Sequence, residues 1–162
     1  EAARLAVRLG ARARIGGAAT RAALAAAGGA DLLHVSAHAR LDADGAALVL
    51  ADGPVTPLDI GRLRPAPRRV VLASCAGAAG TDDTGNGSLA HAFLDAGAEH
   101  VVATKWTIQD TDAARLVMAF YDAGGDRDPV SALAAAQRRL AGTLGVRTWA
   151  SFEVFAARPA VR

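Results

Sequence analysis

The sequence predicts an α/β domain in which helices cover both faces of a mostly parallel β-sheet. Short aliphatic runs alternate along the chain with longer, alanine-rich segments in which apolar residues recur at helical spacing. Two of the short runs, 32–37 and 70–74, are apolar almost throughout, as expected for strands that are buried on both faces. Strands that alternate with helices form parallel sheets, because each connecting helix packs back against the sheet.

Each predicted helix begins or ends at a residue that is typical of a helix terminus. Gly10 and Gly97 follow helix-like segments, and glycine is favoured there because it adopts the left-handed backbone conformation. Ser88 and Asp110 are candidate N-caps, and Pro129 occupies a first helical position, where its missing N–H costs nothing. The expected helices cover residues 1–9, 20–27, 57–63, 88–96, 111–123 and 129–141.

The predicted strands are the aliphatic runs that lie between these helices. Turn residues at 52–54 and prolines within 64–67 separate them. In sheets of this kind, ligands bind at the carboxyl ends of the strands, and both His38 and Cys75 directly follow a strand. The expected strands cover residues 13–15, 32–37, 47–50, 70–74, 99–104 and 152–155.

Length and composition bound the class of protein. A chain of 162 residues is long enough for one domain with a substantial core. The formal net charge is only +2 and no basic run is interleaved with aromatic residues, so nucleic acid is not an expected partner. The sequence contains no apolar stretch of about 18 or more residues, so it predicts no membrane-spanning helix. The single cysteine excludes an intrachain disulfide and fits the reducing cytoplasm.

Cys75 and His38 would together provide the thiol and the imidazole that cysteine hydrolases use for catalysis. Cys75 is the only cysteine and stands between a buried strand and the Gly-rich residues 76–80. A free thiol has a pKa of about 8.5, so an imidazole that accepts its proton raises the fraction of reactive thiolate. The alternatives are that Cys75 is a small buried apolar residue and that His38 is an ordinary surface histidine. His34 lies too far along the strand from His38 to share a metal, and a structural role is expected for it.

The segments 33–38 (LHVSAH) and 70–75 (VVLASC) resemble the CHAT domain, a bacterial caspase-like protease fold. Downstream, residues 88–98 resemble that family's helix and glycine turn, and Trp106 with Asp110 resembles its Trp-x-x-x-Asp motif after a strand. The resemblance implies a three-layer caspase-like fold with a mostly parallel central sheet flanked by helices. Further segments match in the expected order at 120–121, 132–137 and 149–152.

The resemblance assigns roles to the residues at the strand ends. It implies Cys75 as nucleophile and His38 as general acid and base, without a metal or nucleotide cofactor. The oxyanion would be held by the backbone N–H groups of Cys75 and Ala39. The family usually has glycine where this chain has Ala39, and a positive φ there would strain alanine by about 1 kcal/mol or more.

The resemblance also suggests how a substrate is chosen. Separases, which are related caspase-like proteases, have a similar Trp-x-x-x-Asp motif near the pocket for the residue before the cut. A carboxylate at Asp110 would favour arginine or lysine there, with Trp106 beside it and Asp82 and Asp83 as further acids. The alternatives are that Asp110 is only an N-cap and that Trp106 is only a core residue.

The prediction is therefore a cytoplasmic cysteine endopeptidase that cleaves a protein or peptide substrate. Similar domains carry one more strand ahead of the helix at 1–9 and follow a helical-repeat region, so we interpret residues 1–162 as a single excised domain. Its partners would be that repeat region in cis or a regulatory protein, with no nucleic acid and no membrane. One alternative is a weakly active or inactive caspase-like scaffold, which Ala39 motivates. Another is a domain that binds a small molecule such as a nucleotide, although the phosphate-binding motifs are absent.

Overall fold

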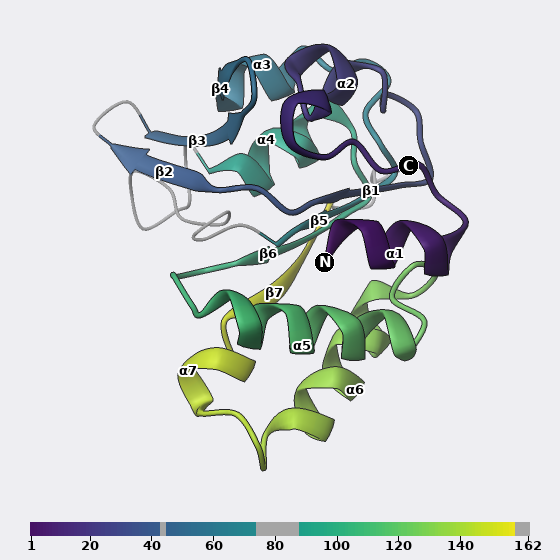
Figure 1. The fold of residues 1–162 in the computed structure, drawn as a ribbon, viewed down its shortest axis with the longest axis vertical. Helices are drawn as coiled ribbons and strands as arrows, with labels where there is room; N and C mark the ends of the chain where they lie inside the picture. Colours follow the sequence, from purple (N-terminus) through teal and green to yellow (C-terminus); the bar gives the residue numbers. More distant parts are fainter. Residues whose placement is uncertain (43–44, 74–87, 158–162) are drawn as a thin grey trace.

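The centre of the computed structural model is a four-stranded sheet between two layers of helices (Figure 1). The structure describes residues 1–42, 45–73 and 88–157. The first three strands in spatial order are parallel and the last is antiparallel, which confirms the predicted mostly parallel sheet. In spatial order the strands are β1 (Leu32–Val35), β5 (Arg69–Leu72), β6 (His100–Thr104) and β7 (Phe152–Ala156).

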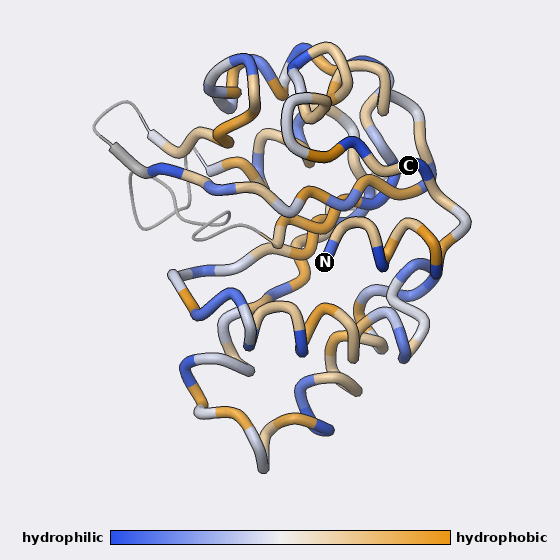
Figure 2. Tube along the Cα trace, in the orientation of Figure 1, coloured by the Kyte–Doolittle hydropathy of each residue, from blue (hydrophilic) through white to orange (hydrophobic). Residues whose placement is uncertain are grey.

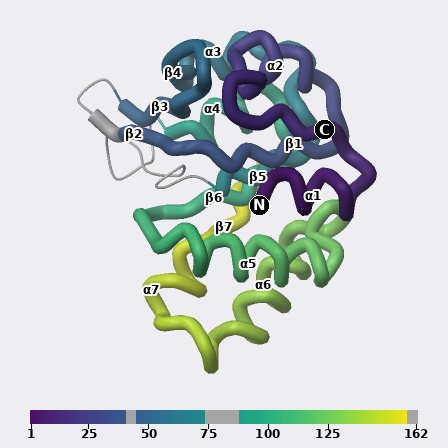
Figure 3. The backbone as a smooth tube through the Cα atoms, viewed as in Figure 1, coloured from purple at the N-terminus to yellow at the C-terminus, as the bar shows by residue number. Residues whose placement is uncertain are grey.

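The helices divide between the two faces of this sheet (Figures 1 and 3). One face carries α1 (Ala2–Leu9), α5 (Asp110–Asp122), α6 (Pro129–Leu140) and α7 (Val146–Trp149). The other carries α2 (Arg21–Ala25), α3 (Pro57–Gly61) and α4 (Leu89–Ala96), and the 3-10 turn η1 (Gly16–Ala18) precedes α2. Among the described residues, no helix has both the length and the apolarity needed to cross a membrane.

The strands divide the core in two because successive side chains point to opposite faces of a sheet. Val71 and Val102 pack with the α1, α5 and α6 side, whereas Val70, Leu72 and Val101 pack with the α2, α3 and α4 side. Figure 2 shows the corresponding concentration of hydrophobic residues along the central strands. Burial on both faces explains why these strands read in the sequence as continuous aliphatic runs.

A small antiparallel sheet stands beside the main one and begins directly after His38. Its strands are β2 (Ala39–Asp42), β3 (Gly45–Leu50) and β4 (Gly53–Val55), in that spatial order. The sequence predicted only the part of β3 at 47–50. β2 alternates apolar and polar residues over only four positions and lacks the aliphatic run of a buried strand, so its signal in the sequence is short.

Several helix ends form as predicted. The Ser88 side chain accepts a hydrogen bond from the His91 N–H, and Gly97 ends α4 with a φ of 113°. Pro129 is in the first turn of α6 after the N-cap Asp128. The helix predicted at 111–123 is present as α5, but its predicted N-cap was wrong: the N-cap is Gln109, without a side-chain cap bond, and Asp110 is already helical. Asp110 therefore does not serve as the N-cap of α5.

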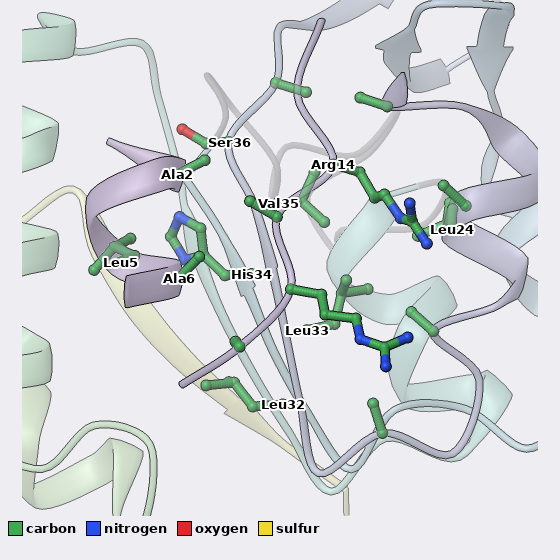
Figure 4. A pocket seen from close by; sticks show the side chains of 18 of the residues that line it. Ala2, Leu5, Ala6, Arg14, Leu24, Leu32, Leu33, His34, Val35 and Ser36 are labelled. Carbon is green, nitrogen blue, oxygen red and sulfur yellow. The ribbon is translucent and has the colours of Figure 1, made fainter. Parts of the chain in front are cut away.

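The predicted strand at 13–15 was also wrong. These residues have no regular secondary structure, and within the described part of the chain no strand pairs with the outer edge of β1. A groove of about 500 Å³ lies between that edge and residues 11–14 (Figure 4). A strand forms only where a partner satisfies its backbone N–H and C=O groups, and at 13–15 none is present.

Candidate active site at the carboxyl ends of the parallel strands

The carboxyl ends of β1 and β5 border a pocket of about 440 Å³. Residues 36–38 follow β1 and Ala73 follows β5, and all of them line it. The opposite wall is formed by the start of α5, including Asp110, and Glu1 from the start of α1 also contributes. The pocket thus occupies the edge of the sheet at which the sequence predicted a site.

His38 is an exposed residue in the short link between β1 and β2. Its backbone carbonyl accepts a 2.8 Å hydrogen bond from the Val49 N–H of β3, which ties the link to the small sheet. The main sheet therefore holds the link at one end and the small sheet holds it at the other. An imidazole supported in this way can exchange protons with a group bound in the pocket.

Cys75 lies outside the described residues, as do Asp82 and Asp83. The described chain after β5 ends at Ala73, which lines the pocket together with His38. The pairing of thiol and imidazole therefore stays a prediction, and it is carried forward as a proposal below.

Ala39 is the first residue of β2, where its Cα pairs with that of Leu48 in the antiparallel register. This is extended backbone, which any L-residue adopts readily. The strain that a positive φ would have imposed on alanine does not arise in this arrangement.

Asp110 and Trp106 are placed differently with respect to the pocket. Asp110 is exposed in the first turn of α5 and lines it. Trp106 is half-buried, its indole Nε1–H donates to the Arg147 carbonyl at 2.7 Å, and it is not among the described residues that line this pocket. The Lys105 ammonium and the Arg147 guanidinium each lie 5.8 Å from the centre of its ring. Asp110 is therefore the nearer of the two to a substrate in the pocket.

A hydrogen-bonded cluster beside the pocket was missed by sequence reasoning. Glu1 Oε1 accepts hydrogen bonds from His34 Nε2 at 3.0 Å and from Ser36 Oγ at 3.1 Å. His34 Nδ1 is hydrogen-bonded to the Tyr121 hydroxyl at 3.1 Å. His34 therefore has the structural role predicted for it, but no local pattern indicates its partners, which are far away in the sequence.

Burial and hydrogen bonds in this cluster shift the pKa values of Glu1 and Tyr121. Burial raises the pKa of Glu1, but the hydrogen bonds and charge of His34 and the hydrogen bond from Ser36 outweigh it and lower the pKa overall. Burial also raises the pKa of Tyr121, so its hydroxyl stays protonated. Glu1 and Asp110 both line the pocket, but Glu1 Oε1 is engaged by His34 and Ser36.

A metal site is not apparent in the described segments, where no group of three or more His, Cys, Asp and Glu side chains could hold an ion. The expectation of a reaction without a metal or nucleotide remains a prediction.

Comparison with known proteins identifies the family. The family model described as "CHAT domain" matches residues 1–157 of the 162-residue chain. No curated protein matches the chain.

Proposed function

Because this chain belongs to the CHAT domain family, which is related to caspase-like peptidases, we propose that it is a cysteine endopeptidase. In this proposal Cys75 is the nucleophile and His38 is the general acid and base. The family match supports the class of protein, and the pocket at the carboxyl ends of β1 and β5 supports the position of the site.

The observation that carries the proposal is that Ala73 and His38 line the same pocket. Cys75 follows Ala73 by two residues, and two fully extended residues span at most about 7 Å. This short separation in sequence supports the proposed pairing of Cys75 with His38 at one pocket wall. A thiol and an imidazole that reach one pocket are the minimal machinery for acyl transfer.

The proposed reaction begins with transfer of the Cys75 thiol proton to His38. The thiolate attacks the carbonyl carbon of the scissile peptide bond, and the backbone N–H groups of Cys75 and Ala39 donate to the oxyanion that forms. His38 then gives its proton to the leaving amine as the C–N bond breaks. Water, deprotonated by His38, hydrolyses the thioester, and the thiol is regenerated.

For the substrate we propose a protein or peptide with arginine or lysine before the cut. Asp110 lines the pocket and is exposed, so its carboxylate is available to a guanidinium or ammonium group. Trp106 is proposed to border the same subsite, beyond the described wall of the pocket.

Control of such a peptidase is part of the proposal. We expect a flanking helical-repeat region or a partner protein to regulate cleavage in the cytoplasm. The scaffold alternative was motivated by Ala39, and its extended backbone in β2 removes the strain on which that argument depended.

The test is labelling by a peptide electrophile together with cleavage of a peptide library. Wild-type protein should be labelled at Cys75 and should cleave, whereas Cys75→Ala should do neither. His38→Gln should slow labelling by about 100-fold, the usual contribution of a positioned base. His91→Gln, a histidine change on α4, is the matched control and should behave as wild type. Equal labelling of wild type and His38→Gln would overturn the dyad.

A further inference from the structure

We propose that Glu1 is a positioning residue whose carboxylate holds the carboxyl end of β1 and thereby fixes where His38 stands in the pocket. This rests on the proposed function only for its effect on the rate of cleavage. The proposed placement of His38 is a structural property, and it can be tested separately.

The contacts of Glu1 join three elements beside the pocket. Its Oε1 accepts from His34 Nε2 within β1 at 3.0 Å and from Ser36 Oγ just beyond β1 at 3.1 Å. On its other side, the His34 ring is hydrogen-bonded to the Tyr121 hydroxyl of α5 at 3.1 Å. The start of α1, the end of β1 and the far end of α5 are therefore connected through one imidazole.

Of these groups Ser36 is exposed to water, whereas the side chains of His34 and Glu1 are shielded. The side chains of His34 and Glu1 are only 9% and 15% exposed. Figure 4 shows His34 between β1 and the helix that carries Ala2 and Ala6, with Ser36 further along the strand. Water therefore competes poorly for the bond between Glu1 and His34, whereas it has access to the Ser36 hydroxyl, which Glu1 holds from the shielded side.

The hydrogen bond between Glu1 and Ser36 holds the chain just ahead of His38. Ser36 precedes His38 by two residues, and Glu1, Ser36 and His38 all line the same pocket. Beyond His38, the bond from Val49 holds its carbonyl. Residues 36–38 lie outside regular strand structure, and the Glu1 contact to Ser36 is a side-chain restraint on the incoming side of this link. Loss of this contact would let the imidazole move relative to the thiol.

A direct electrostatic role is the competing explanation, since Glu1 lines the pocket beside Asp110. The two roles predict different effects of glutamine. Its amide oxygen can accept from both His34 and Ser36 as Oε1 does, but it carries no charge. Glu1→Gln therefore preserves positioning and removes the charge, whereas Glu1→Ala removes both.

The first arm of the experiment is steady-state cleavage in the full chain. Misplacement of a catalytic group by about 1 Å costs up to about 100-fold. We expect Glu1→Ala to lower kcat by tenfold or more with KM changed by less than about threefold, and Glu1→Gln to stay within about twofold of wild type. Glu99→Ala is the matched control, because Glu99 also accepts two side-chain hydrogen bonds, from Arg68, but at the start of β6. It should leave kcat unchanged.

The second arm needs no catalysis. Amide hydrogen exchange at Val49, whose N–H donates to the His38 carbonyl, and the His38 ring signals in NMR spectra are compared in the same variants. Glu1→Ala should raise exchange there by about tenfold and shift the His38 signals, whereas Glu1→Gln and Glu99→Ala should not. The proposal is overturned if Glu1→Ala leaves His38 as in wild type, or if Glu1→Gln disturbs it as much as Glu1→Ala does. If the wild type neither cleaves peptides nor is labelled at Cys75, the proposed function fails, and this arm still decides the role of Glu1.

Discussion

The Ala73 N–H donates a 2.9 Å hydrogen bond to the Val35 carbonyl and extends the parallel pairing of β1 and β5 past its last strand pair, Val35 with Leu72. The chain leaving β1 reaches His38 three residues after Val35, and the chain leaving β5 reaches Cys75 two residues after Ala73. The sheet therefore brings Ala73 and the link that carries His38 to one edge, although they are distant in the sequence.

Substitution of Asp110 should change the choice of substrate. Asp110→Asn keeps the size of the side chain but removes the charge that we propose to pair with a basic residue. We expect kcat/KM for peptides with arginine or lysine before the cut to fall about tenfold or more, with a smaller change for neutral peptides.

Asp112→Asn is the control for that prediction. Asp112 is in the same turn of α5, forms an ion pair with Arg115 at 3.8 Å and is not among the pocket-lining residues. Equal losses for Asp110→Asn and Asp112→Asn would mean that the helix terminus, and not a subsite, is being disturbed.

The sequence predicted the features that depend on local patterns. The aliphatic run before Cys75 predicted β5. Ser88, Gly97 and Pro129 predicted helix termini, because each of these residues satisfies a requirement of the backbone within a few residues. The position of His38 at a pocket followed from topology, since parallel strands end at one edge.

The features that the sequence did not reveal depend on distant partners. Tyr121 and His34 are 87 residues apart and Glu1 and His34 are 33 apart, so no spacing rule connects them. The expected strand at 13–15 failed for the related reason that pairing, and not propensity, decides whether an edge segment becomes a strand.

Acid should weaken the contribution of Glu1 to stability. Its folded-state pKa is below the ordinary value of 4.5, so its contribution is present above about pH 4.5 and is lost as pH falls through the folded-state pKa. We expect Glu1→Gln to be less stable than wild type at pH 7, with the difference narrowing below pH 4.5. Urea unfolding from pH 7 to pH 3 measures this, and a constant difference would contradict it.

A single methyl group at Gly125 should destabilise the fold. A Cβ at this buried position would collide with the ring of Phe120, which is 1% exposed and edge-on to Tyr121. Overpacking of this kind costs about 1–3 kcal/mol. Gly142→Ala, where a Cβ meets nothing within 4 Å, is the control and should be neutral or slightly stabilising. Urea denaturation compares the two, and equal stability of both variants would show that the Phe120 ring moves aside freely.

A strand added ahead of Glu1 should fill the groove beside β1. We propose that the fold accommodates one more strand there, because among the described residues the outer edge of β1 has no partner and a groove of about 500 Å³ borders it. Glu1 lies at the carboxyl end of β1, where it contacts Ser36, so a segment that leads into it through the groove would run parallel to β1.

Fusion of a six-residue valine- and isoleucine-rich segment to Glu1 is expected to raise the urea midpoint and to protect the outward-facing amides of β1 from exchange. The same segment with proline at alternate positions is the control, because proline cannot donate to a strand ladder. If both fusions raised the midpoint equally, apolar contact alone would account for the effect. If neither did so, the groove would not be a strand site.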